Sequence, residues 1–245
     1  ISPRSGITVA DGLDMKVYGG VNPSITTNAA TGSATISLKI SNSAGPLTLT
    51  VADGAAASDL VISGVVAGSN PLVKSGAGLL ELTGSNTYTG GTLLSQGTLT
   101  ARVTNGQNAL GTGRVAVGTG TTLNLNDVNV ANDTTVANVF SGSGTINLLF
   151  ATAGTARNTR INTANALADF TGSLVLGLAS GATTTGDKLA DMSGTTAASL
   201  TIGNGTQLYV SNVAGATFNG GITVSGTGNT ETRGAIRLGA TLGGN

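Results

Sequence analysis

Short runs of alternating apolar and polar residues recur at close intervals along the chain, each bounded by Gly, Asn, Asp or Ser. The runs are about 4–7 residues long, which is the usual length of a β-strand. Apolar side chains at every second position place one face of a strand in a core, whereas an amphipathic helix needs a spacing of three and four residues. No window has the helical spacing, so the sequence predicts an all-β fold.

The predicted strands are rich in Thr, Val and Ile, whose branched side chains suit a pleated surface. The bounding residues tolerate positive φ or bond their own backbone, so they turn the chain. The runs lie at residues 34–40, 47–52, 79–84, 97–103, 113–118, 121–127, 144–150, 172–178, 199–203, 206–213, 221–226 and 234–239. Many short strands form either a sandwich or barrel, or a solenoid.

Three features favour the solenoid. Aromatic residues make up only 3% of the chain, whereas large aromatic side chains usually fill the core of a sandwich, which is about 10 Å thick. Asn-Gly hairpin turns are not the rule, and similar phrases recur with a degenerate period of roughly 20–25 residues. We therefore predict a right-handed single-stranded parallel β-helix, because crossovers between parallel strands are right-handed. Residues 1–245 would form one continuous β-solenoid. Residues 1–60, whose repeat is weaker, would form an irregular cap or end coil.

Charge and residue usage exclude several classes of function. Eleven Lys and Arg balance eleven Asp and Glu without clustering, so the chain lacks the basic patch that nucleic acid or a membrane surface requires. The absence of His and Cys removes the commonest general base and thiolate ligands. Asp11 with Asp14, and Asp187 with Asp191, fall short of the roughly six to eight oxygen ligands of Ca²⁺ and are interpreted as turn residues. We predict no catalytic residue, no cofactor and no metal site.

One stretch carries a specific motif. Residues 74–100 read KSGAGLLELTGSNTYTGGTLLSQGTLT. This pattern resembles the autotransporter-associated β-strand repeat, also called the passenger-associated transport repeat, of bacterial surface and secreted β-helix proteins. The best-matching unit covers residues 61–125. The positions that form the structural repeat motif are Gly76, Gly78, Leu80, Leu82, Gly84, Asn86, Tyr88, Gly90, Gly91, Gly97 and Leu99, and Lys74, Thr92 and Thr98 match as well.

The motif gives specific structural expectations. Three glycines would turn the chain at corners: Gly76, Gly78 and Gly84. Four leucines would stack in the core: Leu80, Leu82, Leu93 and Leu99. Asn86 would pair along a ladder of neighbouring rungs, and Tyr88 would stack there with its hydroxyl group in water.

The resemblance implies a passenger region, often secreted through an outer-membrane barrel, and no shared enzyme activity. We predict a non-catalytic structural or adhesive protein on the extracellular surface of a Gram-negative bacterium. It would stack head to tail into a fibre, with self-association end to end or laterally, and with a host or neighbouring cell surface as a further partner.

Two alternatives stay open. The chain could be a truncated passenger stalk of an autotransporter adhesin, since its last residues read as an interrupted strand. It could also be a glycan-binding or glycan-cleaving β-helix such as a phage tailspike. The absence of Trp and the presence of only three Tyr and four Phe disfavour the glycan alternative.

Overall fold

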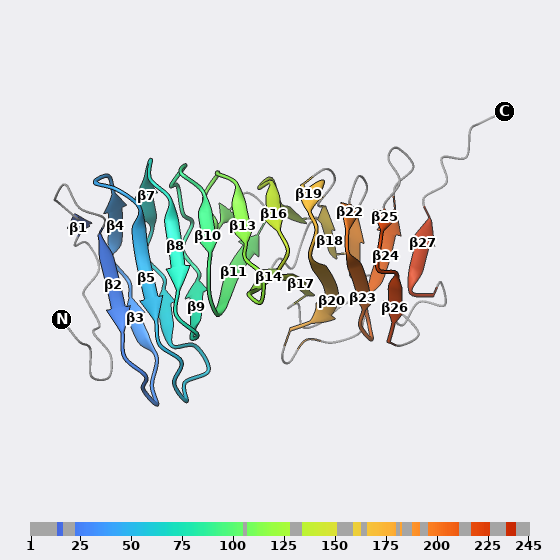
Figure 1. The fold of residues 1–245 in the computed structure, drawn as a ribbon, viewed down its shortest axis with the longest axis horizontal. Coiled ribbons are helices and arrows are strands. Elements are labelled where there is room, and N and C mark those ends of the chain that lie inside the picture. The colour runs from blue at the N-terminus through green and yellow to red at the C-terminus, as the bar shows by residue number, and fades with distance from the viewer. Residues whose placement is uncertain are drawn as a thin grey trace. The chain divides into compact units, whose positions relative to one another are not determined.

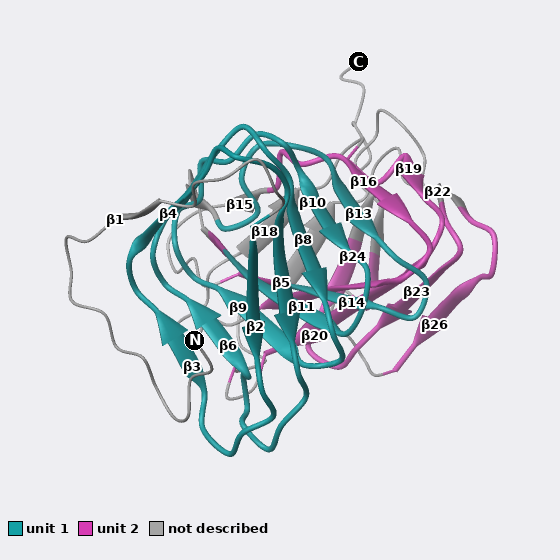
Figure 2. Ribbon diagram, turned by 60° about the vertical axis from the view of Figure 1, so that its left-hand side comes forward, with its two compact units in different colours: residues 1–102, 107–124 teal, residues 103–106, 125–245 magenta. Residues whose placement is uncertain are grey.

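The computed structural model describes most of the chain as short strands. The residues that it describes are 14–16, 23–104, 107–127, 134–150, 159–162, 166–179, 182, 188–191, 196–210, 217–225 and 234–238. Every regular element among them is a β-strand (Figure 1). Within these ranges no helix is long and apolar enough to span a membrane. The chain divides into two compact units, residues 1–102 with 107–124 and residues 103–106 with 125–245 (Figure 2).

In the first unit the chain passes repeatedly over three faces. Face A holds β1 (Asp14–Lys16), β4 (Lys39–Asn42) and β7 (Val66–Gly68). Face B holds β2 (Ser24–Thr27), β5 (Leu47–Val51), β8 (Leu72–Ser75), β10 (Thr92–Leu94) and β13 (Val115–Val117). Face C holds β3 (Ala34–Ile36), β6 (Leu60–Ile62), β9 (Leu79–Leu82), β11 (Thr98–Thr104) and β14 (Thr122–Asp127), and β12 (Gln107–Asn108) pairs with β11.

Successive strands on each face are parallel and in register. Leu60 pairs with Leu80, and Leu80 pairs with Leu99, so equivalent side chains form columns from one rung to the next. The corners vary in length, and the connections from β2 to β3 and from β5 to β6 project furthest (Figure 1). This variation explains the degenerate period of the sequence, because a corner changes length without disturbing the columns.

The second unit has the same construction. One face holds β17 (Thr145–Phe150), β20 (Ser173–Leu178), β23 (Ser199–Ile202) and β26 (Ile222–Val224). Another holds β15 (Thr134–Thr135), β18 (Thr159–Asn162), β21 (Lys188–Asp191), β24 (Gln207–Val210) and β27 (Ile236–Leu238). Two short pairs complete the rungs, β16 (Phe140–Gly142) with β19 (Asp169–Phe170) and β22 (Thr196–Ala197) with β25 (Thr217–Phe218).

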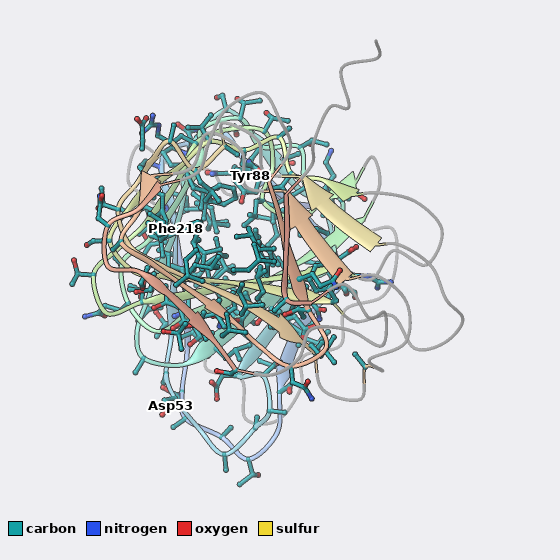
Figure 3. The ribbon with its side chains drawn as sticks, turned by 90° about the vertical axis from the view of Figure 1, so that its right-hand side faces the viewer. Asp53, Tyr88 and Phe218 are labelled. Carbon is teal, nitrogen blue, oxygen red and sulfur yellow. The ribbon has the colours of Figure 1, made fainter. Side chains whose placement is uncertain are left out.

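Strict alternation along each strand builds the core. In β5, Leu47, Leu49 and Val51 are inaccessible to solvent, and the two threonines between them are half-buried. Most core positions are Leu, Ile or Val, and in the second unit Phe140, Phe150 and Phe170 are also fully buried. Figure 3 shows side chains filling the interior, with Tyr88 labelled, whereas Asp53 lies on the projecting connection between β5 and β6.

The predicted all-β solenoid is confirmed, and a strand lies in each predicted run. One run was wrongly joined: residues 34–40 contain two strands on two faces, β3 and the start of β4, because the chain turns a corner at the buried Leu38. The right-handed sense, the continuity of one solenoid over residues 1–245 and the cap at residues 1–60 stay predictions. Within residues 1–60, strands β2 to β5 pair regularly with the strands of the following rungs.

Candidate functional site

Lys74 carries a buried positive charge into the corner that follows β8. Its side chain is fully buried among leucines of the adjacent rungs. Its Nζ donates hydrogen bonds to the carbonyl oxygens of Ser75 at 3.0 Å, Gly76 at 2.7 Å and Gln96 at 3.0 Å. Burial lowers the pKa of Lys74 to about 8, and the negative charge of Asp59 raises it in part. The ammonium group therefore donates to corner carbonyl groups of two successive rungs.

Asp59 plays the complementary part at the same corner. Its side chain is buried at the start of β6. Oδ1 accepts a hydrogen bond from the Gly54 N–H at 2.8 Å, and Oδ2 accepts one from the Leu79 N–H at 2.8 Å. The carboxylate therefore joins its own rung to the start of β9 in the next rung. Sequence reasoning gave no role to either Asp59 or Lys74, because a turn carboxylate and a strand lysine are usually solvated.

Asn86 joins three successive rungs. Its side chain is buried, Oδ1 accepts a hydrogen bond from the Val66 N–H at 2.7 Å, and Nδ2 donates to the carbonyl oxygen of Ala109. The expected contact along the rungs is thus made with backbone groups and not with a stack of asparagines. Each bond satisfies a backbone group for which the corner has no ladder partner.

Tyr88 lies wholly inside the solenoid, so the expectation that its hydroxyl group reaches water is wrong. The segment between β9 and β10 follows face A, where Thr87 and Thr89 donate N–H bonds to Val66 and Gly68 at 2.9 Å. Alternation then directs Tyr88 inward. Its hydroxyl group lies 2.6 Å from Thr92 Oγ1. Burial raises the pKa of Tyr88 above its usual range, and the bond to Thr92 opposes this in part.

Three of the four motif leucines point into the core, and one points to solvent. Leu80, Leu82 and Leu99 are fully buried, as expected, but Leu93 is 43% exposed. The expectation for Leu93 is wrong because β10 directs Thr92 and Leu94 inward, and the residue between them faces solvent. Thr92 can be buried in the core because Tyr88 provides a hydrogen-bond partner for its hydroxyl group.

The motif glycines fall into two groups. Three have positive φ: Gly76 at 78°, Gly91 at 88° and Gly97 at 70°. The others lie against the backbone of the preceding rung, where a Cβ atom would approach a backbone atom to 2.4 Å or less: Gly78, Gly84 and Gly90. The expected corner role thus has two physical causes. At all six glycines a Cβ atom would come to 2.5 Å or less from a backbone atom of a neighbouring rung, and at the first three glycines positive φ acts in addition.

A four-residue turn ending in Gly-Thr recurs at corners in both units. It occupies residues 118–121 in the first unit and residues 203–206 in the second. In each turn the N–H and hydroxyl groups of the last Thr donate to the carbonyl oxygen of the first Gly. The distances are 3.1 and 2.7 Å in the first turn and 3.3 and 2.7 Å in the second. The third residue has positive φ in both, 75° at Gly120 and 78° at Gly205.

Lys74, Asp59 and Asn86 each bind a backbone group of an adjacent rung. These buried polar side chains therefore hold successive rungs together. Within the described ranges no group of three or more His, Cys, Asp or Glu is placed to hold a metal ion. In-register parallel strands, repeated passage over three faces and a filled interior define a parallel β-solenoid.

Residues 72–101 of this solenoid match the family model of the passenger-associated-transport-repeat, which is the family that the motif resembles. Neither the curated proteins nor the solved structures compared with the chain gave a match. The repeat and the fold fit a passenger-type β-helix protein, and such repeats are generally structural. The family implies a secreted or cell-surface bacterial protein.

Proposed function

We propose that this protein is a non-catalytic structural rod of a Gram-negative cell surface, whose copies stack end to end into an extracellular fibre. The matched repeat supports the passenger-type role. The observation that supports stacking is the exposure of the last described rung, whose inward side chains are apolar and remain in contact with solvent.

Strand β26 shows this condition directly. Ile222 pairs with Leu200, and Val224 pairs with Ile202. Leu200 and Ile202 are fully buried, whereas Ile222 is 42% exposed and Val224 is 45% exposed. Among the described residues their columns end at this strand, and the apolar surface that each rung normally buries against the next is exposed here.

Strand β27 repeats the pattern on another face. Ile236 pairs with Leu208, and their exposed fractions are 42% and 2%. Both β26 and β27 lie at the end of their sheets. An edge strand presents unpaired N–H and C=O groups, and natural edges are usually blunted by charge or Pro. Residues 222–224 contain neither, so β26 offers the backbone and apolar surface that fit a further rung.

The charge of the chain is compatible with stacking of identical copies. Eleven basic residues balance eleven acidic ones, so like copies carry no net charge that would repel them. A head-to-tail contact that does not close gives an open polymer. An adhesive role would follow from display of many identical side faces along such a fibre, because weak contacts add through multivalency.

The test uses two variants of the complete chain that differ in the face of β26 they alter. Val224→Lys places a charge in the inward column, whereas Thr223→Lys places it on the opposite face of the same strand. We expect filaments in electron micrographs of the unaltered chain and of Thr223→Lys, and their loss in Val224→Lys. Light scattering that shows monomers at every concentration would contradict the fibre.

The same experiment separates the fibre from the passenger stalk. In a stalk, another segment of one chain covers β26. Monomers in which the amides of residues 222–224 resist hydrogen exchange would therefore support the stalk, since covered strands exchange slowly.

A further inference from the structure

The chain contains three Asn-Gly pairs, at residues 105–106, 204–205 and 219–220. The first lies outside the described residues, and the other two lie in turns of the second unit. An Asn-Gly pair is chemically reactive because glycine has no side chain to hinder its backbone nitrogen from attacking the preceding Asn side chain. The two described pairs differ in whether a hydrogen bond to another described residue holds that nitrogen.

The pair Asn204-Gly205 occupies the middle of the Gly-Thr turn of residues 203–206. The Asn204 side chain is exposed. The hydrogen bonds of this turn run from the N–H and hydroxyl groups of Thr206 to the carbonyl oxygen of Gly203. Within the described part of the chain, no hydrogen bond holds the Asn204 amide or the Gly205 N–H. Neither reacting group is therefore held by a hydrogen bond to a described residue, although Gly205 itself is buried.

The pair Asn219-Gly220 lies in a turn that is tied to the preceding rung. The Gly220 N–H donates to the carbonyl oxygen of Ala198, and the Asn219 N–H donates to that of Ala197 at 3.1 Å. Attack by Gly220 nitrogen requires this bond to break first. Asn219 and Asn204 are both exposed, whereas Gly205 is buried and Gly220 is exposed. The protection expected at Asn219 therefore depends on the hydrogen bond of Gly220 and not on burial.

We propose that Asn204 is a deamidation site of the folded protein and that Asn219 is protected by the fold. The Gly205 nitrogen loses its proton and attacks Asn204 Cγ, and a C–N bond forms. The bond from Cγ to Nδ2 breaks, and Nδ2 leaves as ammonia with the protons that it needs. Water then opens the five-membered imide at either carbonyl, which gives aspartate or isoaspartate at position 204.

The reaction would change both charge and backbone of this corner. Either product places a carboxylate at the exposed position of a turn that is neutral in the unmodified chain. Isoaspartate also adds one methylene to the backbone path between Gly203 and Thr206, whose N–H and hydroxyl bonds close the turn. Strand β24 begins directly after this turn, so the isoaspartate form would loosen the start of that strand.

The chain provides its own matched variant. The turn of residues 118–121 has the same hydrogen bonds and the same positive φ at its third residue, but it carries Thr119 where the second unit has Asn204. Asn204→Thr should therefore keep the turn while it removes the reactive amide.

The experiment follows peptide masses of the complete chain during incubation at mildly alkaline pH, folded and in urea. Replacement of an amide by a carboxylate is read at each Asn-Gly peptide, and isoaspartate is read by its susceptibility to isoaspartyl methylation. We expect conversion at position 204 in the folded chain. Position 219 should convert at least about fivefold faster in urea than in the folded chain, because the fold's hydrogen bond is lost there.

Two further results are expected. The rate at position 204 should rise with pH, because the attacking nitrogen must lose its proton, and Asn204→Thr should abolish the conversion without lowering resistance to urea. Equal conversion of both sites in the folded chain would overturn the proposal. Conversion at position 204 only in urea would overturn it as well.

Discussion

The phenolic oxygen of Tyr88 lies 2.6 Å from Thr92 Oγ1, and both side chains are buried. The two hydroxyl groups share one hydrogen bond four residues apart, at the corner where the chain enters β10. A large aromatic side chain and a polar one can share this thin core because each buried hydroxyl group has the other as a hydrogen-bond partner.

This pairing predicts a non-additive pair of variants. Tyr88→Phe leaves the Thr92 hydroxyl group buried without its partner and should lower the free energy of unfolding by about 1–2 kcal/mol. Adding Thr92→Val removes the stranded hydroxyl group, so the double variant should recover much of that loss. Urea unfolding of both single variants and the double variant measures the coupling. A double variant as unstable as the sum of the two would contradict the pairing.

Asn86 should be among the most sensitive polar positions of the repeat. Asn86→Ala leaves the Val66 N–H and the Ala109 carbonyl group buried without partners, and it opens a small cavity. We expect a loss of about 2–4 kcal/mol in the free energy of unfolding. The control is Asn124→Ala, because Asn124 is half-buried and donates to Thr100 Oγ1 on the outer face. That change should cost less than about 1 kcal/mol, and equal losses would refute a special role for Asn86.

Lys74 should make stability rise with pH on the alkaline side. Its pKa is about 8 in the folded chain, against the ordinary 10.5 expected after unfolding. Between these values the unfolded chain binds more protons, so the free energy of unfolding increases with pH, by up to about 3 kcal/mol in all. Below pH 8 both states keep the proton and the contribution is constant.

The measurement is urea unfolding at several pH values between these two pKa values, on the unaltered chain and on Lys74→Met. The variant has no titrating group at this position, so its stability should lack that part of the slope. Parallel profiles of the two chains would show that the burial of Lys74 does not shift its pKa.

Two corner glycines separate the cost of backbone conformation from the cost of crowding. Gly97 and Gly120 have nearly the same φ, 70° and 75°. A Cβ atom on Gly97 would lie 2.4 Å from the Gly76 carbonyl oxygen, whereas one on Gly120 would meet nothing within 4 Å. Gly120→Ala should cost about 1–2 kcal/mol, the price of positive φ alone. Gly97→Ala should cost clearly more, because backbone of the neighbouring rung must move; equal losses in thermal or urea unfolding would show that crowding does not matter there.

The sequence predicts the strands and the solenoid because alternation and turn residues are local signals. Leu80 and Leu99 stack as their spacing in the motif suggests. Which side of a strand faces inward is less easily predicted from composition. The motif predicts Leu93 as the core residue of its strand, yet Thr92 and Leu94 are buried. The register of β10 is set by its neighbours and by the partner that Tyr88 provides for Thr92.

The polar interior could not be predicted from spacing. The role of Lys74 depends on carbonyl groups of Ser75, Gly76 and Gln96 that converge only when two corners are stacked. The bonds of Asn86 likewise reach backbone groups one rung before it and one rung after it in the chain. The motif marks both residues as matching positions, but only the three-dimensional stacking shows what each one binds.

The in-register columns have a consequence for how such chains change length. A strand in the first unit contacts mainly the strands directly before and after it on the same face, so one rung can be duplicated or deleted if its corners still fit those of its new neighbours. Each rung adds the same rise of about 4.8 Å. The length of such a solenoid therefore depends on the number of its repeats. That number can change in evolution without a change in the side chains of the outer faces or in the projecting corners.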